Sequence, residues 1–163
     1  FFRTWLGNMK VNIVKILCPV DFSEGSTNAL RYAVALGENF GAEVQLMHVV
    51  EMPFMPSYTT AGIPELSVPV EQVQQESRRR LEELAEEYED ICPDLVTHVS
   101  MGAPFVEIVQ EAKRGEFDLI VIGTHGHGGL KHMLIGSVAE KVVRKAPCPV
   151  LTVKHPEHEF VMP

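Results

Sequence analysis

Apolar residues recur along this chain with two spacings, one typical of strands and the other typical of helices. Short apolar or β-branched runs predict five strands, at residues 13–17, 44–50, 95–99, 119–122 and 149–153. Apolar positions three and four residues apart predict four helices, at residues 24–40, 71–90, 104–114 and 137–145. Strand and helix therefore alternate along the chain, which is the pattern of a doubly wound α/β fold with a parallel sheet.

Single residues add detail to these elements. Gly41 follows the first helix as its C-cap, and Gly115 ends the third helix. On the second helix Glu76 and Arg80 stand four positions apart, a spacing that predicts an ion pair on the helix surface. The strand at 119–122 is apolar throughout, as expected of a central strand that is covered on both faces.

The connection at residues 51–70 departs from the regular pattern. It holds four prolines, shows no periodicity, and is long for a connection inside a compact domain. Segments of this kind are either mobile surface loops or lids, and the residues alone leave both readings open.

The two ends of the chain also lie outside the pattern. Residues 1–8 precede Met9, the expected natural start, and are interpreted as an extension or an expression remnant. Residues 155–163 have little pattern and are interpreted as a flexible tail. The remaining residues, 9–154, are expected to form one domain, in line with the length of the chain.

The charge and cysteine content exclude several kinds of partner. Fourteen Lys and Arg against twenty-two Asp and Glu give a net charge of −8, which argues against a basic nucleic-acid surface. No apolar run reaches the roughly 18 residues of a membrane helix. Three cysteines without a C-x-x-C pair suit a reducing compartment. We therefore expect a cytoplasmic protein that binds neither nucleic acid nor membrane.

The glycines of the chain point to a site for an anion. The turn after the first strand, residues 18–23, contains no glycine, and the chain has no P-loop motif. Glycines instead follow the fourth strand, at residues 123–129, and Gly136-Ser137 opens the last helix. Backbone N–H groups in such a loop and at a helix N-terminus attract phosphate, and Lys131 could add a cation. If the strand order reverses between the first and fourth strands, Asp21 faces this loop across one crevice.

Each of these features also has a purely structural explanation. Ser137 and Glu140 form an S-x-x-E capping box, which needs no ligand. Asp21 could serve only as a turn or cap residue before the first helix. It could also accept hydrogen bonds from the amino group of a base or from a ribose hydroxyl, or reach a metal through water. His125, His127 and His132 suggest a metal, but no acidic partner lies near them in the sequence, which argues against a metal site.

Four motifs together resemble the universal stress protein family. They are Ile16–Ser23 with its Pro19 and Asp21, the strand end His48-Val49-Val50, the G-x2-G-x9-G-S string from Gly123 to Ser137, and Pro147–Val150. The G-x2-G-x9-G-S string is similar to the ATP-binding signature of that family, and the resemblance covers about residues 11–154. It implies an adenine nucleotide alpha hydrolase-like fold: a five-stranded parallel sheet of order 3-2-1-4-5 with four helices.

The resemblance also implies roles for individual residues around an adenine nucleotide. Asp21 and Val49 would hold the adenine, with Pro19 and Val20 lining that side. Ile122, Gly123 and Thr124 would meet the ribose. The phosphates would be held by Gly126, Gly136, Ser137 and Val138. The expected ligand is ATP, or else ADP or AMP, with Mg²⁺ or Mn²⁺ carried by the phosphates. No catalytic or metal-ligating side chain is assigned.

The last strand predicts a contact with a second copy of the chain. In order 3-2-1-4-5 it lies at an edge, and its apolar residues include no charge that would discourage pairing. The resemblance likewise implies a homodimer through about residues 149–154. The expected function is a nucleotide-dependent signalling or regulatory dimer of the stress response, with unidentified protein partners. Two alternatives stay open: a slow Mg²⁺-dependent ATP hydrolase or other nucleotide phosphohydrolase using the same pocket, and a partner-binding module with an empty crevice.

Overall fold

A five-stranded, all-parallel sheet of order β3-β2-β1-β4-β5 carries four helices in the computed structural model. The structure describes residues 11–51, 70–124 and 135–154. The strands are β1 (Lys15–Pro19), β2 (Glu43–Val50), β3 (Val96–Met101), β4 (Leu119–Gly123) and β5 (Val150–Val153). The helices are α1 (Glu24–Phe40), α2 (Val70–Glu86), α3 (Pro104–Arg114) and α4 (Ser137–Lys145). The doubly wound fold and its strand order are therefore confirmed.

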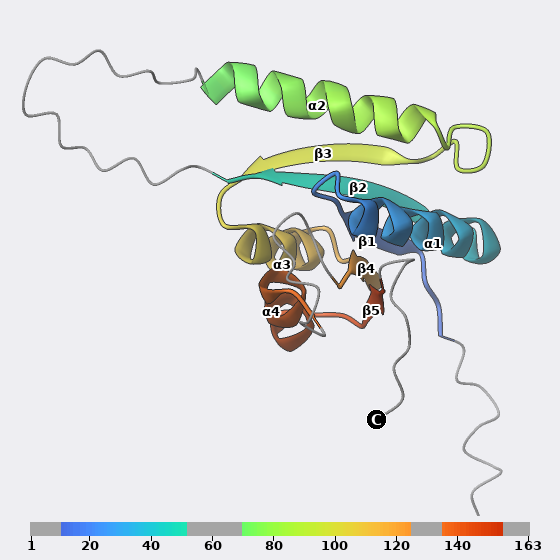
Figure 1. The fold of residues 1–163 in the computed structure, drawn as a ribbon. Coiled ribbons are helices and arrows are strands. Elements are labelled where there is room, and N and C mark those ends of the chain that lie inside the picture. The colour runs from blue at the N-terminus through green and yellow to red at the C-terminus, as the bar shows by residue number, and fades with distance from the viewer. Residues whose placement is uncertain (1–10, 52–69, 125–134, 155–163) are drawn as a thin grey trace, which may run out of the picture.

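Alternate residues of the central strands pack under different helices. Ile16, Cys18 and Val20 belong to the core cluster beneath α1 and α2, whereas Leu17 belongs to the cluster with α3 and α4. The two pairs of helices accordingly lie on opposite sides of the sheet (Figure 1). Every residue of β4 is buried, as expected of a strand covered on both faces.

The strand order reverses between β1 and β4. Ile16 pairs with Leu119 and Leu17 with Ile120, while the other edge of β1 pairs with β2. Because all the strands are parallel, the carboxyl ends of β1 and β4 lie side by side. In open α/β sheets this is where the crevice for a ligand forms.

Several element boundaries differ in detail from the sequence prediction. The second helix ends at Glu86 rather than residue 90, and turns follow it. Gly41 does adopt the left-handed C-cap conformation, with φ 64°, but Gly115 has φ −84°. A Cβ on Gly115 would collide with the ring of Phe117, and Glu116 takes the left-handed conformation instead. Gly115 is thus explained by close packing, not by backbone conformation.

The three cysteines have thiols that resist ionisation. Burial raises the pKa of Cys18, a fully buried residue of β1, to about 12. The pKa values of Cys92 and Cys148 are also raised, first by burial and then by the carboxylates of Asp94 and Asp118 respectively.

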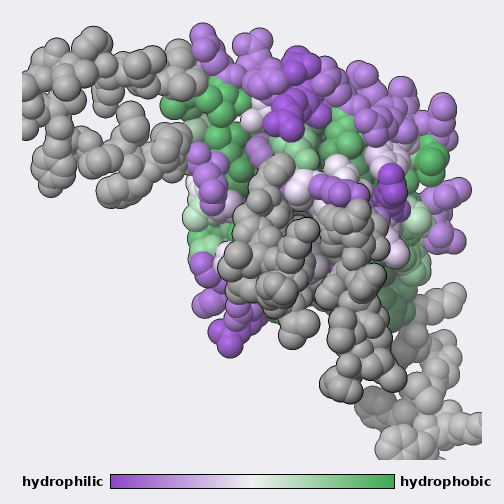
Figure 2. Space-filling view, in the orientation of Figure 1, coloured by the Kyte–Doolittle hydropathy of each residue, from purple (hydrophilic) through white to green (hydrophobic). Residues whose placement is uncertain are grey.

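The outer side of α2 is strongly hydrophilic (Figure 2). Arg79 forms ion pairs there with Glu76 and Glu83, so the predicted pairing of Glu76 with Arg80 is wrong. Both oxygens of the Glu76 carboxylate accept hydrogen bonds from Arg79, and Arg80 lies over the ring of Phe22 instead.

None of the helices in the described ranges combines the length and apolar character needed to span a bilayer.

Candidate functional site

The loop between β1 and α1 begins as a continuation of β1. The Val20 N–H donates to the carbonyl oxygen of Met47 at 2.8 Å, which keeps the chain alongside β2 for one residue beyond Pro19. The loop then turns, and α1 begins at Glu24. The turn places Asp21 at the carboxyl edge of the sheet, between the end of β1 and the start of α1.

Asp21 organises the start of α1 without being its cap. Its Oδ1 accepts hydrogen bonds from the N–H of Ser23 at 3.0 Å and from the Ser23 hydroxyl at 2.5 Å. Ser23 is the N-cap, and its Oγ accepts from the N–H of Ser26. The turn-residue interpretation of Asp21 is therefore correct as far as these contacts go.

His48 on β2 forms a hydrogen bond with the same loop. Its Nδ1 lies 2.8 Å from the carbonyl oxygen of Val20. A carbonyl only accepts, so Nδ1 carries the proton in this contact. The pKa of His48 is lowered chiefly because burial disfavours the charged ring, and the positive charge of Arg80 acts in the same direction. These two effects outweigh the Val20 carbonyl and the Asp21 carboxylate, which favour the charged ring.

We expect the protein to lose stability as the pH falls below 6.5. The folded-state pKa of His48 lies below its usual 6.5, so the unfolded chain takes up this proton at a higher pH than the folded chain. The free energy of unfolding therefore decreases as the pH drops from 6.5 through the folded-state value. Urea unfolding between pH 7.5 and pH 5 measures this loss.

His48→Gln is the control for this prediction, because its amide can still donate to Val20 but does not titrate. The variant should show a shallower pH dependence of stability than the wild type. Glu111 does not interfere in this range. Burial raises its pKa, but hydrogen bonds from Gln45 and Arg114 outweigh this and lower the pKa below the usual 4.5. Equal slopes for wild type and variant would contradict the assignment to His48.

Gly123, at the end of β4, faces the start of α1 at close range. A Cβ at this position would lie 2.8 Å from the carbonyl oxygen of Gly25 and 3.2 Å from the backbone nitrogen of Ser26. The 2.8 Å distance is shorter than real Cβ atoms show to backbone atoms, so the packing of α1 on β4 requires glycine at residue 123. The first glycine of the G-x2-G string thus has a structural reason that is independent of any ligand.

Thr124 joins three elements through its backbone. Its N–H donates to the carbonyl oxygen of Val153 at the end of β5, at 2.8 Å. Its own carbonyl oxygen accepts from the N–H of Gly136 at 2.6 Å. Thr124 is 5% exposed. The start of α4 is therefore fixed directly to the carboxyl ends of β4 and β5.

The N-terminus of α4 has no side-chain cap. Gly136 is the N-cap, with φ −72° and ψ 156°, and Ser137 is already the first helical residue. The S-x-x-E capping box is thus not formed, and Glu140 instead lies 3.7 Å from Arg144 in an ion pair. N–H groups in the first turn of a helix have no acceptor within the helix, and the helix dipole adds partial positive charge there. Within the described residues, this end of α4 has the chemistry of an anion site.

Residues 12–154 match the sequence model of the universal stress protein family. This chain belongs to the universal stress protein family. A universal stress protein of Methanocaldococcus jannaschii, MJ0531, is 37% identical over 146 residues, which cover 89% of this chain and 84% of that protein.

Solved structures of the family share the fold. UspA from Lactobacillus plantarum has a TM-score of 0.71 and 28% identity, over 87% of this chain and 98% of that one. The MJ0577 protein, also from M. jannaschii, has a TM-score of 0.71 and 30% identity, over 90% of this chain and 99% of that one.

In this universal stress protein, the described candidate residues all lie towards the carboxyl edge of the sheet. Pro19 ends β1, and Val20 and Asp21 follow it; Val49 is near the end of β2. Ile122 and Gly123 end β4, and Thr124 follows them. Gly136 is the N-cap of α4, and Ser137 and Val138 are its first residues. Val49 and Ile122 are 8% and 6% exposed and pack in the core cluster with α3 and α4. Gly126, Lys131, His125, His127 and His132 lie outside the described residues.

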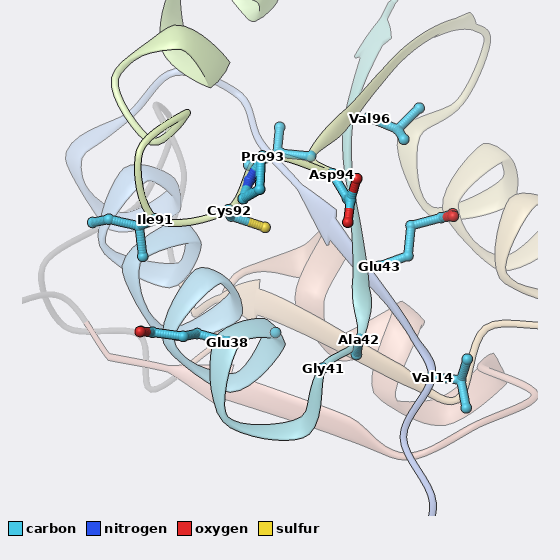
Figure 3. Close-up of a pocket in the computed structure, with 12 residues that line it drawn as sticks. Val14, Glu38, Gly41, Ala42, Glu43, Ile91, Cys92, Pro93, Asp94 and Val96 are labelled. Carbon is cyan, nitrogen blue, oxygen red and sulfur yellow. The ribbon is translucent and has the colours of Figure 1, made fainter.

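Among the described residues of this universal stress protein, no three His, Cys, Asp or Glu side chains come together in a way that could hold a metal ion. A pocket of about 610 Å³ lies at the opposite end of the sheet, beside the first residues of β2 and β3 (Figure 3). Glu38, Glu43, Cys92 and Asp94 are among its lining residues. None of the candidate nucleotide residues lines it, and we assign it no ligand.

Sequence reasoning missed the contact of Phe22 with His48 and Arg80. The rings of Phe22 and His48 are 4.5 Å apart between centroids, and the Arg80 guanidinium carbon lies 4.0 Å from the centroid of the Phe22 ring. These residues come from the β1–α1 loop, β2 and α2. No periodicity along the chain links them.

Proposed function

We propose that this universal stress protein binds an adenine nucleotide in the crevice where the carboxyl ends of β1 and β4 meet. The base would lie towards the β1 and β2 side, near Asp21 and Val49, with Pro19 and Val20 beside it. The ribose would lie over the end of β4, at Ile122, Gly123 and Thr124. The phosphates would reach Gly126 and the first turn of α4, at Gly136, Ser137 and Val138.

The N-terminus of α4 carries this proposal. Gly136 provides no side chain to occupy the first-turn N–H groups, and its bond to Thr124 holds them at the carboxyl edge of the sheet. In a protein with a net charge of −8, attraction for a polyphosphate has to come from such local donors. ATP is the nucleotide that we favour, with Mg²⁺ or Mn²⁺ carried by its phosphates and ADP or AMP as the other candidates.

Related structures support a nucleotide of this class. Two solved universal stress proteins contain cAMP and AMP, the second of them from Arabidopsis thaliana, with TM-scores of 0.58 and 0.63. Each is 20% identical to this chain, a level at which the likeness concerns the fold. The proposal of a nucleotide for this chain rests on its own α4 N-terminus at Gly136, with Asp21 placed at the same edge of the sheet.

The biological role that we propose is regulatory. ATP binding would shift the state or partner choice of a cytoplasmic homodimer that acts in the stress response. β5 is the outer strand of the sheet, carries no charged residue and exposes Leu151. An uncharged edge strand of this kind favours pairing with a second copy of the same strand.

Leu151→Lys should weaken the proposed dimer. A lysine on an edge strand disfavours strand pairing, and in a symmetric dimer the two new charges would lie near one another. We expect roughly a tenfold weaker dimer, measured as the dissociation constant by analytical ultracentrifugation. Val143→Lys, on the exposed side of α4, is the control and should leave association unchanged. If both variants associate like the wild type, the interface is not at β5.

Nucleotide release tests the proposed function most directly. Freshly purified protein is denatured, and the released small molecules are identified by mass spectrometry. Recovery of ATP supports a binding protein, whereas ADP or AMP together with phosphate release from added ATP supports slow hydrolysis at the same site. If no nucleotide is recovered and added ATP does not bind in calorimetry, the proposal is wrong.

A further inference from the structure

Phe22 adopts a backbone conformation that a bulky side chain rarely takes. Its φ is 65°, and among the described residues only Glu116 is another non-glycine residue with positive φ. This region is disfavoured for residues with a Cβ, and a large residue stays there only when its surroundings hold it. Phe22 directly follows Asp21, so its conformation sets the path of the loop at the proposed adenine position.

Two contacts hold the Phe22 side chain. The His48 ring lies 4.5 Å away between centroids, tilted by 43°, and the Arg80 guanidinium lies over the Phe22 ring at 4.0 Å. We call Phe22, His48 and Arg80 the Phe22 stack. His48 belongs to β2 of the sheet. Arg80 belongs to α2, in which Ser77 and Leu81 are buried. Both residues that contact Phe22 are therefore carried by elements that pack in the core.

The backbone on both sides of Phe22 is held as well. Before it, the Val20 carbonyl accepts from His48, and after it, the Ser23 N–H donates to Asp21. The Val20 carbonyl and the Ser23 N–H are thus each held by a hydrogen bond. Phe22 lies between Asp21 and Ser23, so its turn sets the position of the Asp21 carboxylate. Releasing Phe22 would let the carboxylate move relative to β1 and β4.

We propose that Phe22 and Arg80 are positioning residues for the nucleotide site, through which α2 holds the β1–α1 loop and its Asp21 carboxylate in the binding geometry. This inference rests on the proposed function for its binding consequence. Its structural part, that Arg80 orders the loop, can be tested without any ligand. Arg80 is suited to the task because its guanidinium is planar, always charged and attracted to the face of an aromatic ring.

Arg80→Met tests the inference, since methionine keeps an unbranched stem and removes the charge over the ring. We expect the dissociation constant for ATP to rise about two- to fivefold, the value of one exposed cation–π contact. The Ser23 amide, which donates to Asp21, should exchange its hydrogen faster in the absence of nucleotide. Arg80→Lys keeps a cation over the ring and should restore part of both effects.

Arg78→Met is the matched control. It makes the same change of charge on the same helix, about 200° around the axis from Arg80. It should leave both the ATP affinity and the exchange of the Ser23 amide unchanged. All measurements are made at a temperature at which urea titration shows every variant to be fully folded. A general loss of stability then affects neither the ATP affinity nor the exchange of the Ser23 amide.

Phe22→Gly provides the background for a double variant, because glycine tolerates the positive φ and the substitution removes the aromatic ring of the Phe22 stack. In this background Arg80→Met should have no further effect on the exchange of Ser23. If Arg80→Met alters neither exchange nor affinity in the wild-type background, the inference is wrong. If the wild type binds no ATP but Arg80→Met still speeds the exchange of Ser23, the proposed function fails while the ordering of the loop by α2 stands.

Discussion

Gly136→Val should abolish ATP binding and leave the fold intact. The backbone of Gly136, with φ −72° and ψ 156°, is an extended conformation that valine adopts readily, so the helix can still start at Ser137. A branched side chain at the N-cap would occupy the position in front of the first-turn N–H groups, where the phosphates are proposed to lie. We expect an affinity loss of about two orders of magnitude or more, measured by calorimetry, with circular dichroism unchanged.

Gly136→Asp separates the phosphate site from the stability of α4. An aspartate at the N-cap accepts hydrogen bonds from the first-turn N–H groups and complements the helix dipole, so the free energy of unfolding should stay the same or rise by a few tenths of a kcal/mol. The same carboxylate would repel a polyphosphate. Binding of adenosine, which has no phosphate, should be affected much less than binding of ATP. ATP binding by Gly136→Asp with wild-type affinity would place the phosphates elsewhere.

Gly123→Ala should cost about 2–3 kcal/mol of stability, at the upper end of the range for inserting a group into a filled core. The added Cβ would lie 2.8 Å from the Gly25 carbonyl oxygen, and neither atom belongs to a flexible side chain. α1 has to move away from β4 to relieve the contact. Urea unfolding measures the cost, and shifts of the Gly25 and Ser26 amide resonances report the displacement.

Gly41→Ala is the comparison for this variant. Nothing lies within 4 Å of a Cβ at Gly41, so its cost comes only from the left-handed backbone with φ 64°. It should lower stability without shifting the Gly25 and Ser26 resonances. Similar shifts in both variants would show that the close approach of α1 to β4 is not what glycine is needed for at residue 123.

The fold was predictable because its signals are local and repeated. The apolar run at the fourth strand and the helical spacing from Ala29 to Val34 each arise within a few residues, and both reappear as buried positions. The edge position of the last strand follows once the strand order is known. These features depend on short-range periodicity, which a single sequence displays directly.

The site was predictable only in part, because its details depend on choices between local alternatives. Ser137 and Glu140 have the spacing of a capping box, yet Gly136 caps α4 and Glu140 pairs with Arg144. Asp21 fits both a turn and a ligand contact, and its bond to Ser23 is compatible with either. Such alternatives differ by only about 1 kcal/mol, so the sequence pattern does not decide between them.

The contact of Arg80 with Phe22 has no sequence signal at all. The helical spacing to Glu76 pointed to a surface ion pair, but Arg79 pairs with both Glu76 and Glu83. The partner of Arg80 comes from another element, far away along the chain. Contacts of this kind become visible only when the strand order and the packing of α2 are known.

The buried thiol of Cys18 has a consequence for chemical damage. A thiol with a pKa of about 12 is present as the reactive thiolate in only about one molecule in 10⁵ at pH 7. Cys92 and Cys148 also have raised pKa values, so their thiolate fractions are reduced in the same way. Peroxides attack thiolates, and all three sulfur atoms are therefore slow to oxidise. The three thiols of this chain therefore react slowly under conditions that modify low-pKa cysteines in other proteins.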